Sequence, residues 1–192
     1  DATIYALLPV DLDEDGEADF LLAGTMDHGV HRSEPGTDLV GSTNLDEELL
    51  STYWDQVSYL TINTVIQALA FDDAGDVLFA GTYGFGVLRS DDVGDFLNWN
   101  RVNNGIENTW VYSLLDYKDG SDEYLFAGTW NGGVFRSDNS GETWDYIGLA
   151  NRVVYDLALY EDDDLGFPVV YAATDRGEVT RSVDNGLSWQ EI

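Results

Sequence analysis

The densest group of metal-binding side chains in this sequence is a short acidic stretch near its start. Residues 11–19 read DLDEDGEAD. Carboxylate and backbone carbonyl oxygens are the ligands that Ca²⁺ prefers, and the glycine at position 16 permits the sharp turn that such a loop requires. The pattern predicts a metal site, with Ca²⁺ as the cofactor, formed by Asp11, Asp13, Asp15, Glu17 and Asp19.

An acidic hairpin turn without a metal is the alternative for this loop. Other acidic turns occur at residues 72–76, 118–123 and 161–166, although none of them keeps the spacing of the first one. The loop is not an EF-hand, because its twelfth position is Leu22 and not a glutamate. Its spacing resembles instead the calcium loop of FG-GAP-type repeats, and this resemblance also implies bound Ca²⁺.

A fourfold internal repeat determines where the other candidate residues lie. Four segments are copies of one another: LLAGTMDHGVHRS (21–33), LFAGTYGFGVLRS (78–90), LFAGTWNGGVFRS (125–137) and VYAATDRGEVTRS (170–182). Four tryptophans, at positions 54, 99, 144 and 189, recur every 45 residues. A fixed period means that one supersecondary unit is repeated and stacked. Positions that recur in every copy are expected to be scaffold, and function is sought at the positions that vary.

Each unit contains four short β-strand patterns. In the third unit they are residues 111–117, 123–129, 133–138 and 143–148, which are rich in Val, Tyr, Phe, Leu and Thr and are separated by Gly, Asp and Asn. Four antiparallel strands in each repeat are typical of a propeller blade. We expect an all-β fold, with residues 1–192 forming a single β-propeller domain of four four-stranded blades at about 1–56, 62–101, 108–148 and 151–192.

Two arrangements of these blades remain open. Four blades can close into a small ring, or they can form an arc of a larger ring that other blades or another chain complete. The first unit starts with its innermost strand and the last unit ends with its outermost strand, so no blade mixes strands from the two termini. An open arc exposes an apolar blade face, and we expect self-association or further blades at such an edge.

The turn between the third and fourth strands carries the most specific motif. It reads SVDNGLSW in residues 182–189 and SDNSGETW in residues 137–144, and SDDVGDFLNW in residues 90–99 has two extra positions. This motif resembles the Asp-box of sialidase-type (BNR) repeats, as in exported bacterial proteins. The Asp or Asn accepts hydrogen bonds from the turn, glycine supplies a positive φ, and the tryptophan packs on a neighbouring sheet. The predicted Asp-box residues are Ser90, Asp92, Gly94, Trp99, Ser137, Asn139, Gly141, Trp144, Ser182, Asp184, Gly186 and Trp189.

The loops that vary between the copies are expected to meet on one face of the propeller. In this fold the loops between the second and third strands share a face with the connectors between blades. Their aromatic rings, with amide and basic neighbours, suit a protein or glycan ligand. The alternative is that the rings only fill the centre of the propeller. The predicted ligand-binding residues are Tyr83, Phe85, Trp110, Trp130, Asn131 and Arg176.

A glycosidase is the alternative function, because Asp-box propellers include sialidases and xyloglucanase-like enzymes. A sialidase site needs three arginines around a carboxylate, but Arg32, Arg89, Arg136 and Arg181 share one repeat position and are predicted to connect neighbouring blades. A xyloglucanase-like site needs two facing carboxylates. Its best candidate is Asp156, which lies on an innermost strand where the other units have alanine or serine. We expect no catalytic residues, and a polysaccharide-acting hydrolase fragment that uses Asp156 is the alternative.

The amino-acid composition limits which classes of molecule the protein can bind. The net charge of −29 repels nucleic acid and anionic membranes, and no apolar run is long enough to enter a membrane. The absence of cysteine is compatible with either a cytosolic protein or a bacterial or archaeal exported one, and we expect the exported one. The sequence therefore predicts an acidic, calcium-stabilised, non-catalytic binding or assembly module that is extracellular, at the cell surface or periplasmic.

Overall fold

The computed structural model describes residues 3–11, 18–33, 54–56, 64–72, 77–91, 98–119, 122–162 and 167–192. These ranges contain β-strands and no helix, so no described segment is a helix that is long and apolar enough to cross a membrane.

The strands form four antiparallel sheets, in which neighbours in sequence are also neighbours in the sheet. Blade 1 consists of β1 (Ile4–Val10), β2 (Phe20–Thr25), β3 (Val30–Ser33) and β4 (Trp54–Gln56). Blade 2 consists of β5 (Ile66–Asp72), β6 (Val77–Thr82), β7 (Gly86–Ser90) and β8 (Asn100–Arg101). Blade 3 consists of β9 (Val111–Asp119), β10 (Asp122–Thr129), β11 (Gly133–Ser137) and β12 (Asp145–Gly148). Blade 4 consists of β13 (Val154–Asp162), β14 (Phe167–Thr174), β15 (Val179–Ser182) and β16 (Gln190–Glu191).

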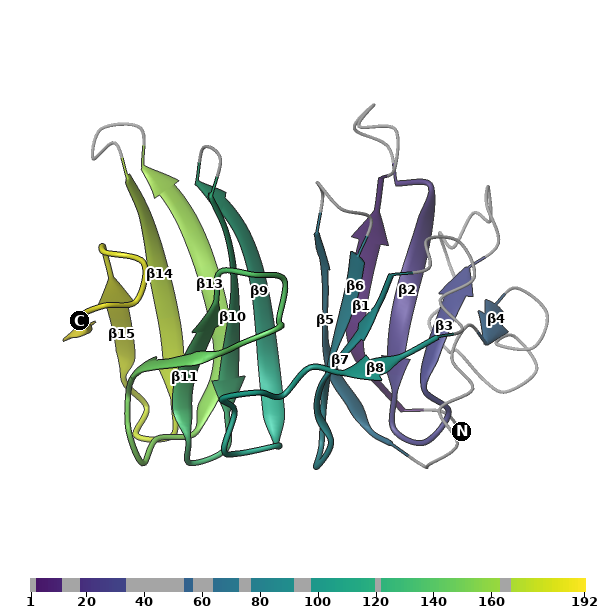
Figure 1. The fold of residues 1–192 in the computed structure, drawn as a ribbon, viewed down its shortest axis with the longest axis horizontal. Coiled ribbons are helices and arrows are strands. Elements are labelled where there is room, and N and C mark those ends of the chain that lie inside the picture. Colours follow the sequence, from purple (N-terminus) through teal and green to yellow (C-terminus); the bar gives the residue numbers. More distant parts are fainter. Residues whose placement is uncertain are drawn as a thin grey trace.

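The blades follow one another around a common axis, from β1–β4 at one end of the molecule to β13–β15 at the other (Figure 1). Their innermost strands are in contact in order, β1 with β5, β5 with β9 and β9 with β13. The fold is an all-β, four-blade β-propeller, and the predicted fold class is confirmed.

The two faces of blades 2 and 3 are buried in different cores, because successive side chains of a strand point to opposite sides of the sheet. We call the side that packs on the following blade the forward face and the side that packs on the preceding blade the backward face. The forward side chain of Phe79 lies in the core between blades 2 and 3. The forward side chain of Phe126 lies in the core between blades 3 and 4. Both rings are at most 1% exposed, and such burial stabilises by about 1.5–3 kcal/mol for each side chain.

A glycine on the second strand allows neighbouring blades to approach closely. A Cβ atom placed on Gly81 would lie 2.8 Å from Val111, and one placed on Gly128 would lie 2.8 Å from Val154. Gly24 has the same relation to Ile66, at 2.6 Å. A real Cβ atom does not approach another carbon atom this closely, so the recurrence of this glycine follows from the packing of the blades.

The turn before each outermost strand is held by a serine and an acidic or amide side chain. In blade 3, Ser137 Oγ accepts the N–H of Gly141 at 2.9 Å and Asn139 Oδ1 accepts the N–H of Thr143 at 2.9 Å. In blade 4, Ser182 Oγ and Asp184 Oδ1 make the equivalent bonds at 2.8 Å. We call residues 137–144 and 182–189 the serine–aspartate turns. Residues 92–97, with the predicted Asp92 and Gly94, lie outside the described part of the chain.

Arginine and tryptophan side chains connect consecutive blades. Arg89 donates from Nη1 to the carbonyl of Ser140 at 3.0 Å, and Arg136 donates to the carbonyl of Asn185 at 2.8 Å. These bonds confirm the predicted blade-to-blade role at two of the four repeated arginines. In the opposite direction, Trp144 donates from Nε1 to the carbonyl of Val102 at 2.6 Å. The turn of one blade is therefore attached to the blade before it.

Among the described residues, the innermost strands of the first and last blades, β1 and β13, are not packed on each other as the other innermost strands are. Both β1 and β13 are described over their whole lengths, and no contact comparable to those between the other innermost strands joins them. Leu7 on β1 is 60% exposed and Tyr160 on β13 is 56% exposed. The blades stand around one axis, as in a ring, but the backward face of blade 1 and the forward face of blade 4 remain open.

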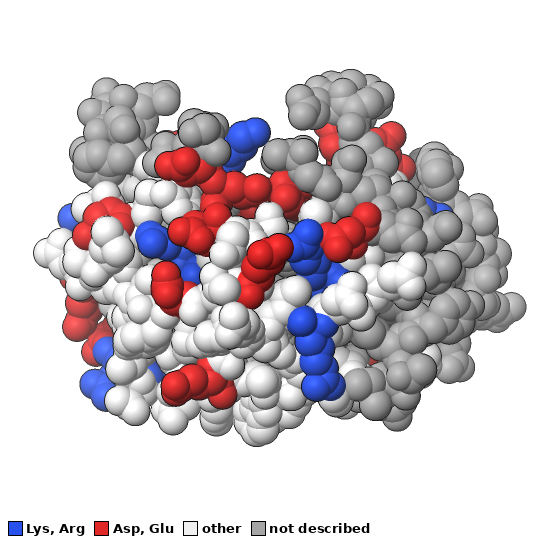
Figure 2. All heavy atoms as spheres, viewed as in Figure 1, with Lys and Arg blue, Asp and Glu red and all other residues white. Residues whose placement is uncertain are grey.

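Acidic side chains meet where blades 2 and 3 come together. Asp72 at the end of β5 is 3% exposed and is hydrogen-bonded to Glu123 at the start of β10. This bond, followed by burial and by the charges of Asp72 and Asp116, raises the pKa of Glu123 from 4.5 to about 8, and Lys118 opposes the shift. On the side of the molecule shown in Figure 2, acidic side chains gather toward the end that carries the β9–β10 turn.

The pH dependence of stability tests this carboxyl pair. The folded protein keeps a proton on Glu123 that the unfolded chain loses above pH 4.5, so stability is expected to fall as the pH rises from 4.5 to about 8. We expect Glu123→Gln to remove this decline and to raise the Tm at the upper end of the range. Thermal melts across the range provide the measurement. The exposed Asp145→Asn is the control and should keep the decline, whereas an unchanged decline in Glu123→Gln would contradict the assignment.

Candidate functional site

The loops between the second and third strands are held by the threonine of the repeated Ala-Gly-Thr segment. Thr82 Oγ1 donates to the carbonyl of Gly86 at 2.8 Å and accepts the N–H of Phe85 at 3.0 Å. The other three blades repeat the bond from threonine to the carbonyl four residues later, from Thr25, Thr129 and Thr174. The scaffold therefore fixes these loops in the same way in all four blades, while their remaining residues vary.

The same loops are tied to the connectors that lead into the innermost strands. The N–H of Tyr83 donates to the carbonyl of Val65 at 3.0 Å, and the N–H of Trp130 donates to the carbonyl of Trp110 at 2.9 Å. In Figure 1 both kinds of segment lie at the lower edge of the described molecule, opposite the β9–β10 turn. The loops and connectors share one face, as the sequence predicts. We call it the axial face.

A β-bulge at the start of each innermost strand interrupts the alternation of side chains. The register of the sheet shifts between Ile4 and Ala6 in blade 1, and equivalent shifts occur in the other three blades. A bulge adds one residue to a strand and redirects its side chain. The residues at this position are Tyr5, Gln67, Tyr112 and Tyr155. Three of the four are tyrosines, and they stand beside the axial loops.

Five aromatic rings form a continuous group on the axial face, and we call them the aromatic cluster: Tyr83, Trp110, Tyr112, Trp130 and Tyr155. Tyr83 and Trp110 are stacked, with ring centroids 4.4 Å apart and an angle of 24° between the rings. Tyr112 lies 5.9 Å from Trp130 and also 5.9 Å from Tyr155, which it meets edge-on at 82°. The rings come from three successive blades, so only the folded propeller brings them together.

The aromatic cluster is open to solvent. Tyr83 is 42% exposed, Trp130 is 39% exposed and Tyr155 is 49% exposed. Burial, and then the neighbouring Tyr83 and Tyr155, raise the pKa of Tyr112 above its ordinary value. Exposed rings that contact one another are rigid apolar surface, which gives binding energy at a small cost in conformational entropy.

The structure brings only part of the predicted ligand-binding set together. Tyr83, Trp110 and Trp130 are members of the aromatic cluster. Phe85 is instead covered by Arg101, whose guanidinium carbon lies 4.5 Å from the ring centroid. Arg176 is exposed on the loop after β14.

The prediction missed Tyr112 and Tyr155. Both lie on innermost strands, whereas the predicted set was taken from loops and connectors. An alignment of the four bulge positions identifies them as a variable set that is rich in aromatic residues.

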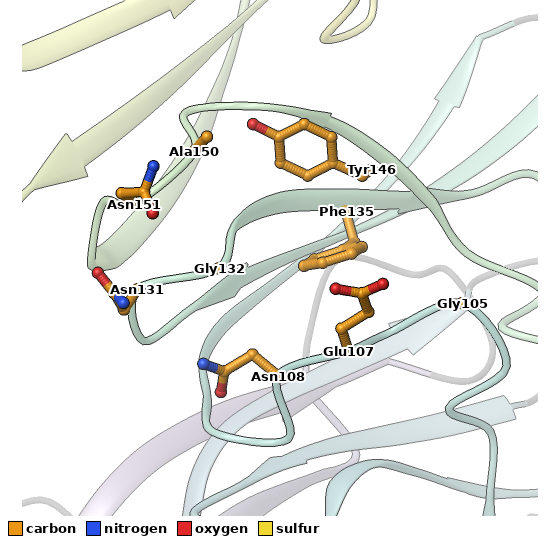
Figure 3. A pocket seen from close by; sticks show the side chains of 9 residues that line it. All are labelled: Gly105, Glu107, Asn108, Asn131, Gly132, Phe135, Tyr146, Ala150 and Asn151. Atoms are coloured by element: carbon orange, nitrogen blue, oxygen red, sulfur yellow. The ribbon is translucent and has the colours of Figure 1, made fainter.

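A pocket of about 510 Å³ lies beside the cluster (Figure 3). It is lined by Gly105, Glu107, Asn108, Asn131, Gly132, Phe135, Tyr146, Ala150 and Asn151. Figure 3 shows the Glu107 carboxylate below the ring of Phe135, with Tyr146 on the other side of that ring. The pocket thus combines amides, two aromatic rings and one carboxylate, and no lining residue is basic.

Asn108 connects the pocket to the aromatic cluster. Its Nδ2 donates to the carbonyl of Trp130, and its Oδ1 accepts the N–H of Trp110 at 3.0 Å. Asn131 and Asn151 line the same pocket with positive φ angles of 56°, a conformation that asparagine tolerates better than most residues. The amide groups of the pocket are therefore carried by the same loops that position the aromatic rings.

The predicted calcium loop is described only at its two ends. Asp11 follows β1, and the N–H of Asp19 donates to the carbonyl of Val10 at 2.8 Å, which closes the turn. Asp13, Asp15 and Glu17 lie outside the described residues. Within the described residues, no group of three or more histidine, aspartate or glutamate side chains is arranged to hold a metal ion. Calcium at this loop stays a prediction.

Asp156, the alternative catalytic residue, lies on the forward face of blade 4. It pairs with Ala173 across the sheet, and its Oδ1 accepts the N–H of Leu157 at 3.0 Å. The side chain is exposed. The carboxylate that lines the pocket is that of Glu107, which is carried by the connector between blades 2 and 3.

Comparisons with known proteins concern the fold. No protein-family model matches the chain, and no curated protein matches it either. The structure is similar to the extracellular domain of a one-component system from B. thetaiotaomicron, with a TM-score of 0.63 and 20% identity over 98% of this chain and 22% of that one. It is also similar to an ancestral GH74 enzyme, with a TM-score of 0.67 and 19% identity over 98% of this chain and 25% of that one.

A third similar structure is that of YCF48 bound to D1 peptide. The TM-score is 0.58 and the identity is 17%, over 96% of this chain and 55% of that one. The chain therefore spans about a quarter of the length of the first two proteins and about half of the third. At these identities the similarity is one of fold, and this chain shares the β-propeller fold with enzymes and with binding proteins.

Proposed function

We propose that this chain is a non-catalytic binding or assembly module of an extracellular or cell-surface protein, and that its aromatic cluster anchors a protein or glycan ligand. The observation that carries the proposal is the cluster itself. Five rings from three blades meet on the axial face, and three of them are exposed by about two-fifths to one-half. Tryptophan and tyrosine are the residues that most often dominate binding energy at interfaces.

The pocket beside the cluster supplies polar contacts for the same ligand. Asn108, Asn131 and Asn151 offer amide donors and acceptors, and Glu107 offers a carboxylate. Because the pocket has no basic lining residue and the chain carries a net charge of −29, a neutral or cationic ligand is favoured over an anionic one. Nucleic acids and anionic membrane surfaces are therefore not proposed as partners.

The location outside the cell and the type of repeat are also proposals. Similarity to the extracellular domain from B. thetaiotaomicron supports export, and the absence of cysteine is compatible with it. The hydrogen bonds of the serine–aspartate turns support an assignment of these repeats to the Asp-box type.

The alternative function is that of a fragment of a polysaccharide hydrolase, and similarity to GH74 enzymes supports it at the level of the fold. Such a site requires two carboxylates that face each other across the bound sugar. Asp156 lies on the forward face of blade 4, and the pocket presents the separate carboxylate of Glu107. We therefore assign ligand binding to the aromatic cluster and no catalytic step to Asp156.

Substitution of one ring tests the binding proposal. The protein is screened on a glycan array and on a peptide array, and the best ligand is titrated by fluorescence. We expect Trp130→Ala to weaken that ligand by about 30-fold, which corresponds to the loss of an anchor of about 2 kcal/mol.

Tyr160→Ala, an exposed ring outside the cluster, is the matched control and should bind normally. The proposal fails if both variants bind equally well. It also fails if the protein cleaves a β-glucan and Asp156→Asn abolishes that cleavage.

Calcium is tested through thermal stability. Four aspartates and the carbonyl of Glu17 in residues 11–19 are proposed to bind Ca²⁺, and a ligand that binds only the folded state stabilises it by about 2.7 kcal/mol at 100 times its Kd. We expect millimolar CaCl₂ to raise the Tm in moderate salt, and Asp13→Ala with Asp15→Ala to remove the response. Glu161→Ala, near the end of β13 and before a later acidic turn, serves as the control and should keep the response. A Tm that is the same with calcium and with chelator would favour a plain acidic turn.

A further inference from the structure

Each serine–aspartate turn packs on the blade before it. The same kinds of residue make this contact between blades 2 and 3 and between blades 3 and 4. A Cβ atom placed on Gly141 would lie 3.3 Å from the ring of Phe79 and 3.2 Å from Val102. A Cβ atom placed on Gly186 would lie 3.4 Å from the ring of Phe126 and 2.2 Å from Ile147. The glycine of the turn thus packs on an aromatic ring of the second strand and on an aliphatic residue that follows the tryptophan by three positions.

An arginine completes this contact. The residue before each turn glycine has a positive φ, 52° at Ser140 and 53° at Asn185. The carbonyls of these two residues accept the hydrogen bonds from Arg89 and Arg136 of the preceding blade. We call the aromatic ring, the aliphatic residue and the arginine of the preceding blade the turn socket.

Blade 4 has a turn socket on its open forward face. The repeat places Tyr171 at the position of Phe126, Ile192 at the position of Ile147 and Arg181 at the position of Arg136. Ile192 is 63% exposed. Among the described residues, Arg181 has no hydrogen bond or ion pair of the kind that its two counterparts make.

Other side chains on the forward face of blade 4 are also more exposed to solvent than their counterparts in blades 2 and 3. Val179 is 40% exposed, whereas its counterparts Val87 and Val134 are fully buried. Tyr160 is 56% exposed, whereas its counterpart Tyr117 is 7% exposed. The forward face of blade 4 therefore keeps the residue types of a blade interface but is open to solvent.

We propose that the forward face of blade 4 docks a fifth propeller blade that carries a serine–aspartate turn and continues the repeat from Ile192. The glycine of that turn packs on Tyr171 and Ile192, and the carbonyl before it accepts a hydrogen bond from Arg181. The proposed interface repeats those between blades 2 and 3 and between blades 3 and 4, with the same three kinds of contact at the same repeat positions.

Ala173 selects which blade fits. The equivalent positions in blades 1 to 3 are glycines, and each of them lies against a β-branched residue at the start of the next innermost strand. The Cβ of Ala173 occupies the space that this residue needs. The fifth blade is therefore expected to have a small residue, alanine or serine, where blades 2, 3 and 4 have Ile66, Val111 and Val154.

A second copy of residues 1–192 is a poor occupant of the same face. Its first blade has Ile4 at the position that Ala173 restricts. It also lacks the serine–aspartate motif, of which only Ser33 and Trp54 remain in the sequence. Both features that the socket recognises are therefore missing from the first blade.

An extended chain tests the proposal. A second copy of residues 148–192 is joined directly after Ile192, with alanine in place of its Val154, so that the repeat continues at its period of 45 residues. We expect a higher Tm and slower amide hydrogen exchange at Val179 and Thr180, by about ten-fold or more, which corresponds to about 1.4 kcal/mol of local stability. Arg181→Gln should reduce this gain, and it should leave the Tm of the original chain unchanged.

A double-mutant cycle isolates the steric contact between Ala173 and the first residue of the innermost strand in the appended blade. Retaining valine in the appended blade should weaken docking, and Ala173→Gly in blade 4 should restore it. The proposal would be overturned if the amide hydrogen exchange rate at Val179 were the same as in the original chain, whether the appended blade carries alanine or valine. A dimer of the original chain in sedimentation that Arg181→Gln disrupts would also overturn it, because the face would then belong to a second copy.

Discussion

Neighbouring blades approach each other closely at the glycine of the second strand, and this contact sets how the blades are oriented relative to one another. At Gly24, Gly81 and Gly128 a single added methyl group would overlap the next innermost strand. This approach allows the turn of one blade to reach the arginine of the blade before it, and the tryptophan of that turn to reach a backbone carbonyl. Because the interfaces are this tight, the loops at the axial end have fixed positions relative to one another.

The aromatic cluster is a consequence of this packing. Its rings come from three blades, so their mutual distances depend on how the blades are rotated against each other and not on local sequence. The glycine is replaced by Ala173 in blade 4, the one blade whose forward face is uncovered. The proposed ligand binding and the proposed docking of another blade thus use different faces of the molecule, the axial face and the end of the arc.

The repeat was sufficient to predict the fold, because the spacing of the tryptophans and the Gly-Thr segments reports the period of a stacked unit. It also placed Tyr83, Trp110 and Trp130 on one face, since loop positions follow from strand order. Tyr112 and Tyr155 were missed because a β-bulge turns them out of the alternating pattern of their strands. The pair of Asp72 and Glu123 was missed because it joins two blades through residues that sequence alone treats as separate turns.

The uncovered face of blade 4 requires that the arc is open, with β1 and β13 apart. The chain contains no cysteine, so Leu7→Cys and Tyr160→Cys would place two spin labels uniquely on the two open faces. Pulsed electron paramagnetic resonance on the dilute, monomeric protein then measures the distance between β1 and β13. We expect one population, in which the labels are well separated across the opening of the arc. A short distance, with the labels in contact as in a closed ring of four blades, would contradict the open arc.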